Sequence, residues 1–225
     1  MTRVLIVGVG PGLSASLARQ LAAAGHSVAL AARRTDKLKP LAAETGATLH
    51  QCDAADPGSV SALFEAVPDA GIVSYNASFR VRGPFVDLDP AEVRRTMEVC
   101  GFGAFLVAQQ AARRMLASGR GGTILLTGAS AGVKGYPQSA PFAMGKFALR
   151  GLAQSMAREL HPRGIHVVHV VVDGGIRAEA RPEPTDAPDS LLDPDAIART
   201  MMALVEQDRS CWTDEIAVRP WVERF

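Results

Sequence analysis

Residues 3–14 read Arg3-Val4-Leu5-Ile6-Val7-Gly8-Val9-Gly10-Pro11-Gly12-Leu13-Ser14, and this stretch decides the fold. An apolar run of strand length leads into a glycine-rich turn, and the turn opens an amphipathic helical pattern. Glycines let the backbone turn tightly and approach a pyrophosphate, whose charge the N-terminus of the next helix stabilises. A glycine-rich string alone is a weak indication. Here the strand and the helix on either side of it predict a dinucleotide site at Gly8, Gly10, Pro11, Gly12 and Leu13.

Outside this stretch, apolar runs of strand length alternate with helical patterns. The runs lack polar alternation, as expected of parallel strands buried on both faces. Such alternation predicts right-handed crossovers and a Rossmann-type, doubly wound parallel sheet in a three-layer α/β/α fold. We expect a single domain over residues 1–225. The predicted strands are 4–7, 28–32, 47–51, 71–75, 123–127, 165–172 and 215–218, and the predicted helices are 13–24, 36–45, 57–66, 90–117, 139–161 and 194–207.

Composition excludes several classes of protein. Lys and Arg number 24 against 23 Asp and Glu, so the net charge of +1 gives no basic surplus for nucleic-acid binding. No apolar run is long enough to cross a membrane, and no segment resembles a signal peptide. The scattered cysteines Cys52, Cys100 and Cys211 favour a reducing compartment over a disulfide framework or a zinc site. We therefore expect a cytoplasmic protein without a metal.

Residues 177–194 are rich in Pro, Asp, Glu and Ala and predict a long loop. Long loops in compact domains often act as lids, which favours a substrate-side lid here. A mobile surface insertion without a role fits the composition equally well.

The whole chain resembles the short-chain dehydrogenase/reductase family. That family spaces its glycines as G-x-x-x-G-x-G; Gly8 and Gly12 match, and Ser14 stands at the last glycine. The Ser14 hydroxyl would either bind a phosphate oxygen or cap the helix. The resemblance also assigns Asp53 to the adenine amino group, unless it only caps the following turn. It places Asn76 and Ala77 along the adenosine.

Arg33 and Arg34 end the second predicted strand, where an NAD enzyme usually carries an acidic residue for the ribose 2′-hydroxyl. Guanidinium groups suit a 2′-phosphate instead, so these residues favour NADP(H) over NAD(H). The alternative is a pair of solvated surface charges. On the nicotinamide side, the resemblance implies that Gly174 and Ile176 hold the carboxamide. Arg177 would reach the diphosphate or a substrate carboxylate, or simply face solvent.

The family's catalytic Asn, Ser, Tyr and Lys correspond to Cys100, Ala129, Phe142 and Lys146. Only the lysine is retained, and it would still bind the nicotinamide ribose without proton transfer. The resemblance thus extends to an atypical subgroup with Phe at the tyrosine position. Tyr136 is a candidate substitute proton donor, with ordinary ring packing as the alternative. The histidines, including His166 and His169, are expected to be structural.

These features predict an NADP(H)-binding oxidoreductase with a degenerate catalytic tetrad and a small-molecule substrate. The rivals are a non-redox NADP(H)-binding regulator or structural protein, and an isomerase or cyclase that reuses the pocket. The resemblance assigns the helices over 90–117 and 139–161 to subunit contacts, and the apolar tail over 212–225 adds an exposed end. We expect a homodimer or homotetramer, unless the tail only covers its own sheet.

Overall fold

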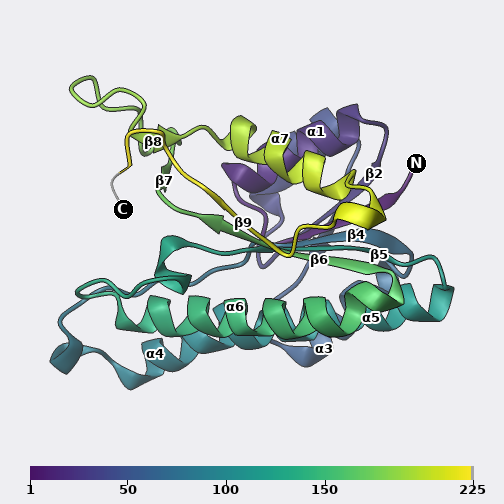
Figure 1. The fold of residues 1–225 in the computed structure, drawn as a ribbon, viewed down its shortest axis with the longest axis horizontal. Coiled ribbons are helices and arrows are strands. Elements are labelled where there is room, and N and C mark those ends of the chain that lie inside the picture. The colour runs from purple at the N-terminus through teal and green to yellow at the C-terminus, as the bar shows by residue number, and fades with distance from the viewer. Residues whose placement is uncertain (224–225) are drawn as a thin grey trace.

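The computed structural model describes residues 1–223 and forms one α/β unit around a central sheet. Arg224 and Phe225, the end of the predicted interface tail, lie outside the described residues. The seven strands follow the order β3-β2-β1-β4-β5-β6-β9, and every neighbouring pair is parallel (Figure 1). This confirms the doubly wound, three-layer architecture. The strands are β1 Arg3–Val7, β2 Ser27–Ala32, β3 Thr48–Gln51, β4 Ala70–Tyr75, β5 Gly122–Thr127, β6 Ile165–Val172 and β9 Glu215–Val218.

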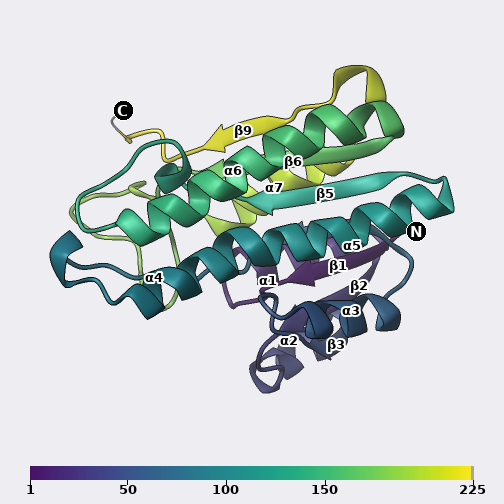
Figure 2. The ribbon, with the colours of Figure 1, turned by 90° about the horizontal axis from the view of Figure 1, so that it is seen from below.

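Helices cover both faces of the sheet. Figures 1 and 2 show α1 and α7 on one face and α4, α5 and α6 on the other. The strand residues alternate between the two cores: Val4 and Ile6 pack towards α1 and α7, whereas Leu5 and Val7 pack towards α3 and α5. The helices are α1 Leu13–Ala23, α2 Lys39–Thr45, α3 Pro57–Ala66, α4 Pro90–Met97, α5 Gly103–Ser118, α6 Ala140–Leu160 and α7 Pro194–Val205.

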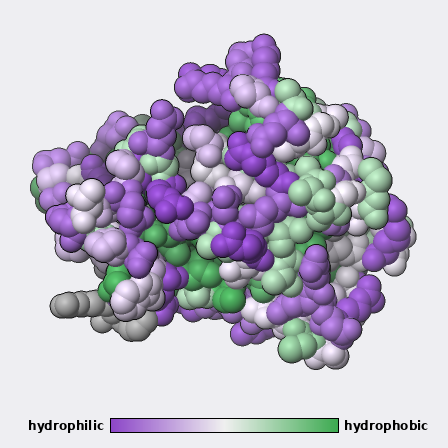
Figure 3. Space-filling view, turned by 90° about the horizontal axis from the view of Figure 1, so that it is seen from above, coloured by the Kyte–Doolittle hydropathy of each residue, from purple (hydrophilic) through white to green (hydrophobic). Residues whose placement is uncertain are grey.

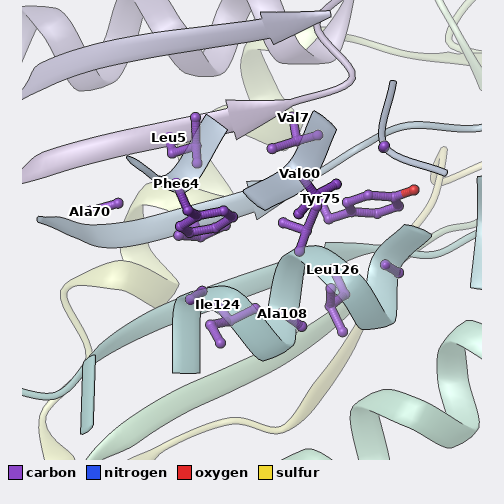
Figure 4. Close-up of a cluster of buried hydrophobic side chains, with 14 of the residues drawn as sticks. Leu5, Val7, Val60, Phe64, Ala70, Tyr75, Ala108, Ile124 and Leu126 are labelled. Atoms are coloured by element: carbon purple, nitrogen blue, oxygen red, sulfur yellow. The ribbon is translucent and has the colours of Figure 1, made fainter. Parts of the chain in front are cut away.

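The core between the sheet and α3 and α5 is drawn in Figure 4. Phe64 and Tyr75 are its two largest fully buried side chains. The Tyr75 hydroxyl donates a hydrogen bond to the Val99 carbonyl, and burial raises the pKa of this phenol far above its ordinary value. Tyr75 is therefore a structural anchor between β4 and the helical layer.

The helix predicted over 90–117 is interrupted. A π-helical turn, Glu98–Phe102, separates α4 from α5. The Val99 carbonyl lies within this turn and accepts the Tyr75 hydroxyl, so a side chain enters the helical hydrogen-bond ladder, a known cause of such irregularities. At Gly103 a Cβ atom would come within 2.7 Å of both the Ala54 carbonyl oxygen and the Tyr75 hydroxyl. The apolar pattern is continuous through the turn and gives no sign of it.

The segment predicted as a loop over 177–194 is shorter in the structure. Two short parallel strands, β7 Gly175–Ile176 and β8 Leu191–Leu192, close its base. Asp193 then caps α7 by accepting the backbone N–H of Asp195, so 177–190 is the part outside these elements. The Arg177 guanidinium lies 3.1 Å from the Asp193 carboxylate. That arginine is thus tied to the base of the loop.

No helix within residues 1–223 combines the length and apolar character needed to span a bilayer. Figure 3 shows the face above the sheet, where hydrophilic residues dominate and hydrophobic ones form patches between them. Exposed aromatic side chains on α5 and α6, Phe105 and Phe147, belong to the opposite helical layer.

Candidate active site

Two clefts lie along the carboxyl ends of the parallel strands, where ligands bind in open α/β sheets. The first has a volume of about 570 Å³ and the second about 460 Å³. Both are lined by Asn76 and Ser78, so they meet directly after β4. Most of the sequence-predicted residues divide between them, whereas Gly12, Leu13, Ser14 and Cys100 line neither cleft. The first cleft is lined by Gly8, Gly10, Pro11, Arg33, Arg34, Asp53, Asn76 and Ala77, and the second by Ala129, Tyr136, Phe142, Lys146, Gly174 and Ile176.

The glycine turn is built for close approach on one side and open space on the other. Gly8 has φ +84°, and a Cβ atom there would overlap the Ala77 backbone nitrogen. At Gly10 and Gly12 an added Cβ would meet no atom within 4 Å. Gly12 is the N-cap of α1, and no side chain caps that helix end. The turn therefore offers room and helix N–H groups for a phosphate.

The Ser14 hydroxyl faces the protein. It accepts a hydrogen bond from Asn76 Nδ2 at 2.6 Å and donates to the Gly8 carbonyl at 3.4 Å. The Asn76 backbone N–H also donates to the Val7 carbonyl at 2.8 Å. The Ser14 hydroxyl does not cap the helix but ties the glycine turn to the end of β4, and its binding to a phosphate oxygen stays a prediction. Leu13, also expected at the cofactor, is buried in the α1 core.

Three cations lie where the second strand ends. Arg33, Arg34 and Lys37 all line the first cleft and are exposed. Within residues 1–223 neither Arg33 nor Arg34 forms an ion pair. The sequence analysis did not name Lys37 as a residue of this cleft, although its place just after the two arginines was a usable signal.

Asp53 makes contacts on both carboxylate oxygens. Oδ1 accepts the Ala55 backbone N–H at 3.0 Å, and Oδ2 lies 2.8 Å from Arg95 Nη2. Burial acts to raise the pKa of this carboxyl, but the hydrogen bonds from Arg95 and Ala55 outweigh it and hold the pKa below its ordinary value. The Ala55 contact means that Asp53 does cap the turn over residues 53–56, as the alternative expected, and Asp56 then caps the helix α3.

Lys146 is almost completely buried between α6 and β5. Its ammonium donates to the Thr127 carbonyl at 2.8 Å, and burial lowers its pKa. One turn earlier on the same helix, the Phe142 ring has its centroid 5.7 Å from Lys146 Nζ. The Arg80 guanidinium carbon lies 5.1 Å from that centroid. The ring therefore sits beside two cations, as an aromatic face favours.

The other catalytic positions behave differently from one another. Ala129 and Ser130 both line the second cleft, and so does Tyr136, whose ring is contacted by the Lys134 ammonium. Cys100 is fully buried in the π-helical turn and does not line this cleft. Its Sγ lies 3.5 Å from the Phe79 carbonyl oxygen and 3.7 Å from Ser78 Oγ. Cys100 therefore supports the segment behind the cleft.

The family model described as short chain dehydrogenase matches residues 2–187 of this chain. The chain belongs to the short-chain dehydrogenase family. The cyclic-di-GMP-binding biofilm dispersal mediator protein of Escherichia coli (strain K12) is 33% identical over 182 residues, which are 80% of this chain and 75% of that protein. The trans-4-hydroxycyclohexanecarboxylate dehydrogenase of Sinomonas cyclohexanicum is 31% identical over 178 residues, 72% of this chain and 68% of that protein.

Solved structures agree with this assignment. A short-chain dehydrogenase from Rhodopseudomonas palustris superposes with a TM-score of 0.85 at 32% identity, covering 97% of this chain and 98% of that one. Short-chain dehydrogenases are oxidoreductases that bind a nicotinamide cofactor and act on small molecules, and they are commonly oligomeric. The open glycine turn and the unpaired Arg33 and Arg34 fit such a cofactor in size and charge.

Sequence reasoning missed the cationic wall of the second cleft. Arg80 and Arg82 follow β4, and Arg181 lies in the 177–190 segment. Two arginines at alternate positions after a strand end were a signal for the first pair. Arg181 carried none, because only the fold brings it to the cleft.

A second missed feature lies beside the site. His169 Nδ1 is 2.9 Å from Glu215 Oε2, and Arg150 holds the same carboxylate with contacts of 2.7 and 2.6 Å. His169 was expected to be structural, and its role as a buried partner of Glu215 agrees with that expectation. In residues 1–223 no cluster of three or more His, Cys, Asp or Glu is arranged to hold a metal.

Proposed function

We propose that this short-chain dehydrogenase is an NADP(H)-dependent oxidoreductase of the atypical subgroup with Phe at the tyrosine position. The main support is that Phe142 and Lys146 lie together in the second cleft, which meets the first cleft at Asn76 and Ser78. The first cleft keeps the glycine turn and the cationic residues that would bind a dinucleotide. The second cleft keeps Lys146 but has Phe142 in place of the catalytic tyrosine.

The cofactor would lie across both clefts. The glycine turn and the open N-terminus of α1 hold its diphosphate, and Arg33 and Arg34 hold the 2′-phosphate, with Lys37 nearby. Asp53 lines the first cleft, and its partly exposed carboxylate would accept the adenine amino group in addition to its contacts with Ala55 and Arg95. Gly174 and Ile176 hold the carboxamide, and Lys146 binds the ribose hydroxyls.

The chemistry that NADPH supplies when bound is hydride donation to an electron-poor carbon. The chain's own residues position the substrate and govern the proton. Phe142 has no ionisable group, and Ala129 cannot polarise a carbonyl oxygen. General acid catalysis contributes about 10²–10⁴-fold, so its loss favours substrates activated by other means, such as protonated imines. Ser130 and Tyr136 line the cleft near Phe142 and carry hydroxyl groups that could donate a proton, as do Ser78, Thr127 and Ser139.

The proposal also covers the oligomeric state and the cellular compartment of the protein. We place the subunit interface of a homodimer or homotetramer on α4, α5 and α6, where Phe105 and Phe147 are exposed together with Phe102 of the π-helical turn. We place the protein in the cytoplasm, which agrees with three cysteines that form no disulfide. Its partner is a small molecule, with neither nucleic acid nor membrane involved.

The test has two stages. Calorimetric titration with NADPH and NADH comes first and is expected to show binding with NADPH preferred. The absorbance of NADPH is then followed with a panel of ketones, imines and enones. Oxidation of NADPH by an imine or enone at a rate well above that of simple ketones supports the proposal. Binding without oxidation by any compound in the panel would favour the non-redox rivals.

A further inference from the structure

Three arginines gather at the mouth of the second cleft. Arg80 and Arg82 come from the segment after β4, and Arg181 comes from the segment between β7 and β8. The Arg181 side chain packs against β7, with Nη1 3.3 Å from the position a Cβ would take at Gly175. Two segments separated by about half the chain therefore supply cations to one wall.

These cations lack counter-charges. No Asp or Glu lines the second cleft, and within the described residues none of the three arginines forms an ion pair. Other arginines of the chain are paired: Arg177 with Asp193, Arg150 with Glu215 and Arg95 with Asp53.

The three groups also influence one another. Burial, and then the charges of Arg82 and Arg181, lower the pKa of Arg80. Like charges that approach without a carboxylate between them repel, and an anion bound among them would relieve that repulsion. The three positive charges therefore favour the binding of an anion at the cluster.

Its position distinguishes it from the phosphate sites of the cofactor. The glycine turn, Arg33 and Arg34 all belong to the first cleft. The arginine cluster shares its cleft with Phe142, Lys146 and Ile176, and Arg80 lies over the ring of Phe142 itself. An anion at the cluster would therefore belong to the molecule that reacts beside the nicotinamide.

We propose that Arg80, Arg82 and Arg181 bind an oxyanion group of the substrate, a carboxylate or a phosphate. Guanidinium forks match the geometry of both groups and form charge-assisted hydrogen bonds with them. The substrate class becomes an anionic carbonyl or imine compound, with the reacting carbon next to Phe142 and the anion held at the cleft mouth. This inference deepens the proposed function by naming the substrate class.

The test measures binding, so it does not depend on turnover. The protein saturated with NADPH is titrated calorimetrically with isophthalate, phenylphosphonate and isophthalamide. The diamide has the shape of isophthalate without its charge. We expect one or both anions to bind at least about tenfold more tightly than the diamide. The stronger of the two anions identifies the oxyanion class. Equal binding of all three compounds, or no binding of either anion, would overturn the proposal.

Variants then locate the site. Arg80→Met keeps the aliphatic packing on Phe142, and Arg82→Gln and Arg181→Gln remove the other two charges. Each change should weaken the preferred anion about tenfold while NADPH affinity stays the same. Arg80→Lys should recover part of the lost affinity. Arg199→Gln, an exposed change on α7, is the matched control. An equal loss in the Arg199 variant, or unchanged anion binding in all three cleft variants, would contradict the assignment. Loss of NADPH oxidation with anion binding intact would count against the proposed function alone.

Discussion

The Lys146 ammonium lies 5.7 Å from the centre of the Phe142 ring, one helical turn away, and donates a hydrogen bond to the Thr127 carbonyl. A desolvated cation gains about 2 kcal/mol or more from an aromatic face. The ring can therefore help to keep a buried lysine charged, which opposes the lowering of its pKa by burial. It cannot donate a proton. With Phe142 beside it, Lys146 could still bind the cofactor ribose but could not assist proton transfer by a tyrosine.

Restoring the phenol tests this separation. Wild type should be weak on plain ketones, and Phe142→Tyr alone should add little because Ala129 leaves the carbonyl unpolarised. Phe142→Tyr with Ala129→Ser should raise ketone reduction by about 10²-fold or more, since groups that act as a unit are non-additive. Steady-state rates of NADPH oxidation measure this. High wild-type ketone activity that Tyr136→Phe leaves unchanged would mean that the catalytic positions are misassigned.

Cofactor preference depends on Arg33 and Arg34. NADPH should bind more tightly than NADH by about 1–3 kcal/mol, the range for charge-assisted bonds to a phosphate. Arg33→Asp should shift the preference towards NADH in calorimetric titrations. Lys39→Asp makes the same change of charge nearby but outside the first cleft, and should leave the ratio unchanged. Equal affinities of wild type for both cofactors would contradict this prediction.

Substitutions at Gly8 and Gly10 should distinguish an effect on folding stability from an effect on cofactor binding. Gly8→Ala forces a Cβ onto Ala77 and a residue other than glycine to φ +84°, so we expect a marked fall in Tm. Gly10→Ala adds a methyl group to open space. It should keep the Tm within a few degrees and weaken NADPH binding, because the methyl group occupies the phosphate path. The opposite ranking of the two Tm values would show that the turn is built differently.

The Arg150–Glu215–His169 contacts should appear in the dependence of stability on pH. The hydrogen bond from Arg150 is the main cause that lowers the pKa of Glu215 below its ordinary value of 4.5. The charged form therefore contributes stability fully above pH 4.5, and the contribution disappears as the pH falls further. Glu215→Gln should cost about 1–2 kcal/mol at pH 7, discounted for partial exposure, and the difference from wild type should narrow below pH 4.5.

His169 adds to the same trend. Burial lowers its pKa below 6.5, so an unfolded chain takes up a proton that the folded ring resists as the pH falls below 6.5. Thermal unfolding from pH 7 to pH 3.5 measures both effects. Glu179→Gln, an exposed change, is the control. A constant difference between wild type and Glu215→Gln across this range would argue against the assignment.

Light scattering tests the interface on α4, α5 and α6. We expect a dimeric or tetrameric mass for wild type at micromolar concentration. Phe105→Glu places a charge on this exposed apolar face and should shift the mass towards the monomer. Arg199→Glu on α7 should not. A monomeric wild type would refute the predicted assembly.

The sequence predicted those elements whose patterns are local. The bounds of Pro57–Ala66 and Ile165–Val172 agree with the structure, because a proline at the first helical turn and an apolar run buried on both faces are unambiguous. The bounds of Glu215–Val218 agree as well, although that strand is only partly buried. The sequence did not predict the π-helical turn at Glu98–Phe102, since the Tyr75 hydroxyl that bonds to this turn comes from another element.

In the candidate site, too, local motifs could be predicted and contacts between distant residues could not. The glycine turn and Phe142-x-x-x-Lys146 are contiguous motifs and were predicted. The arginine cluster and the Glu215 contacts are formed by residues far apart in the chain, so only tertiary structure assembles them. The contact of the Ser14 hydroxyl with Asn76 was not predicted, because Asn76 follows a different strand.

The pairing of β6 with β9 also bears on synthesis. All eight residues of β6 are buried, yet one of its edges is covered only by β9, a strand that is made much later than β6. Until β9 leaves the ribosome, that edge offers free backbone groups to any other extended chain. A chain whose synthesis pauses in α7 has an incomplete sheet in which the apolar strand β6 is an unpaired edge. The speed of translation over the final segment therefore influences how much of this protein reaches its native state.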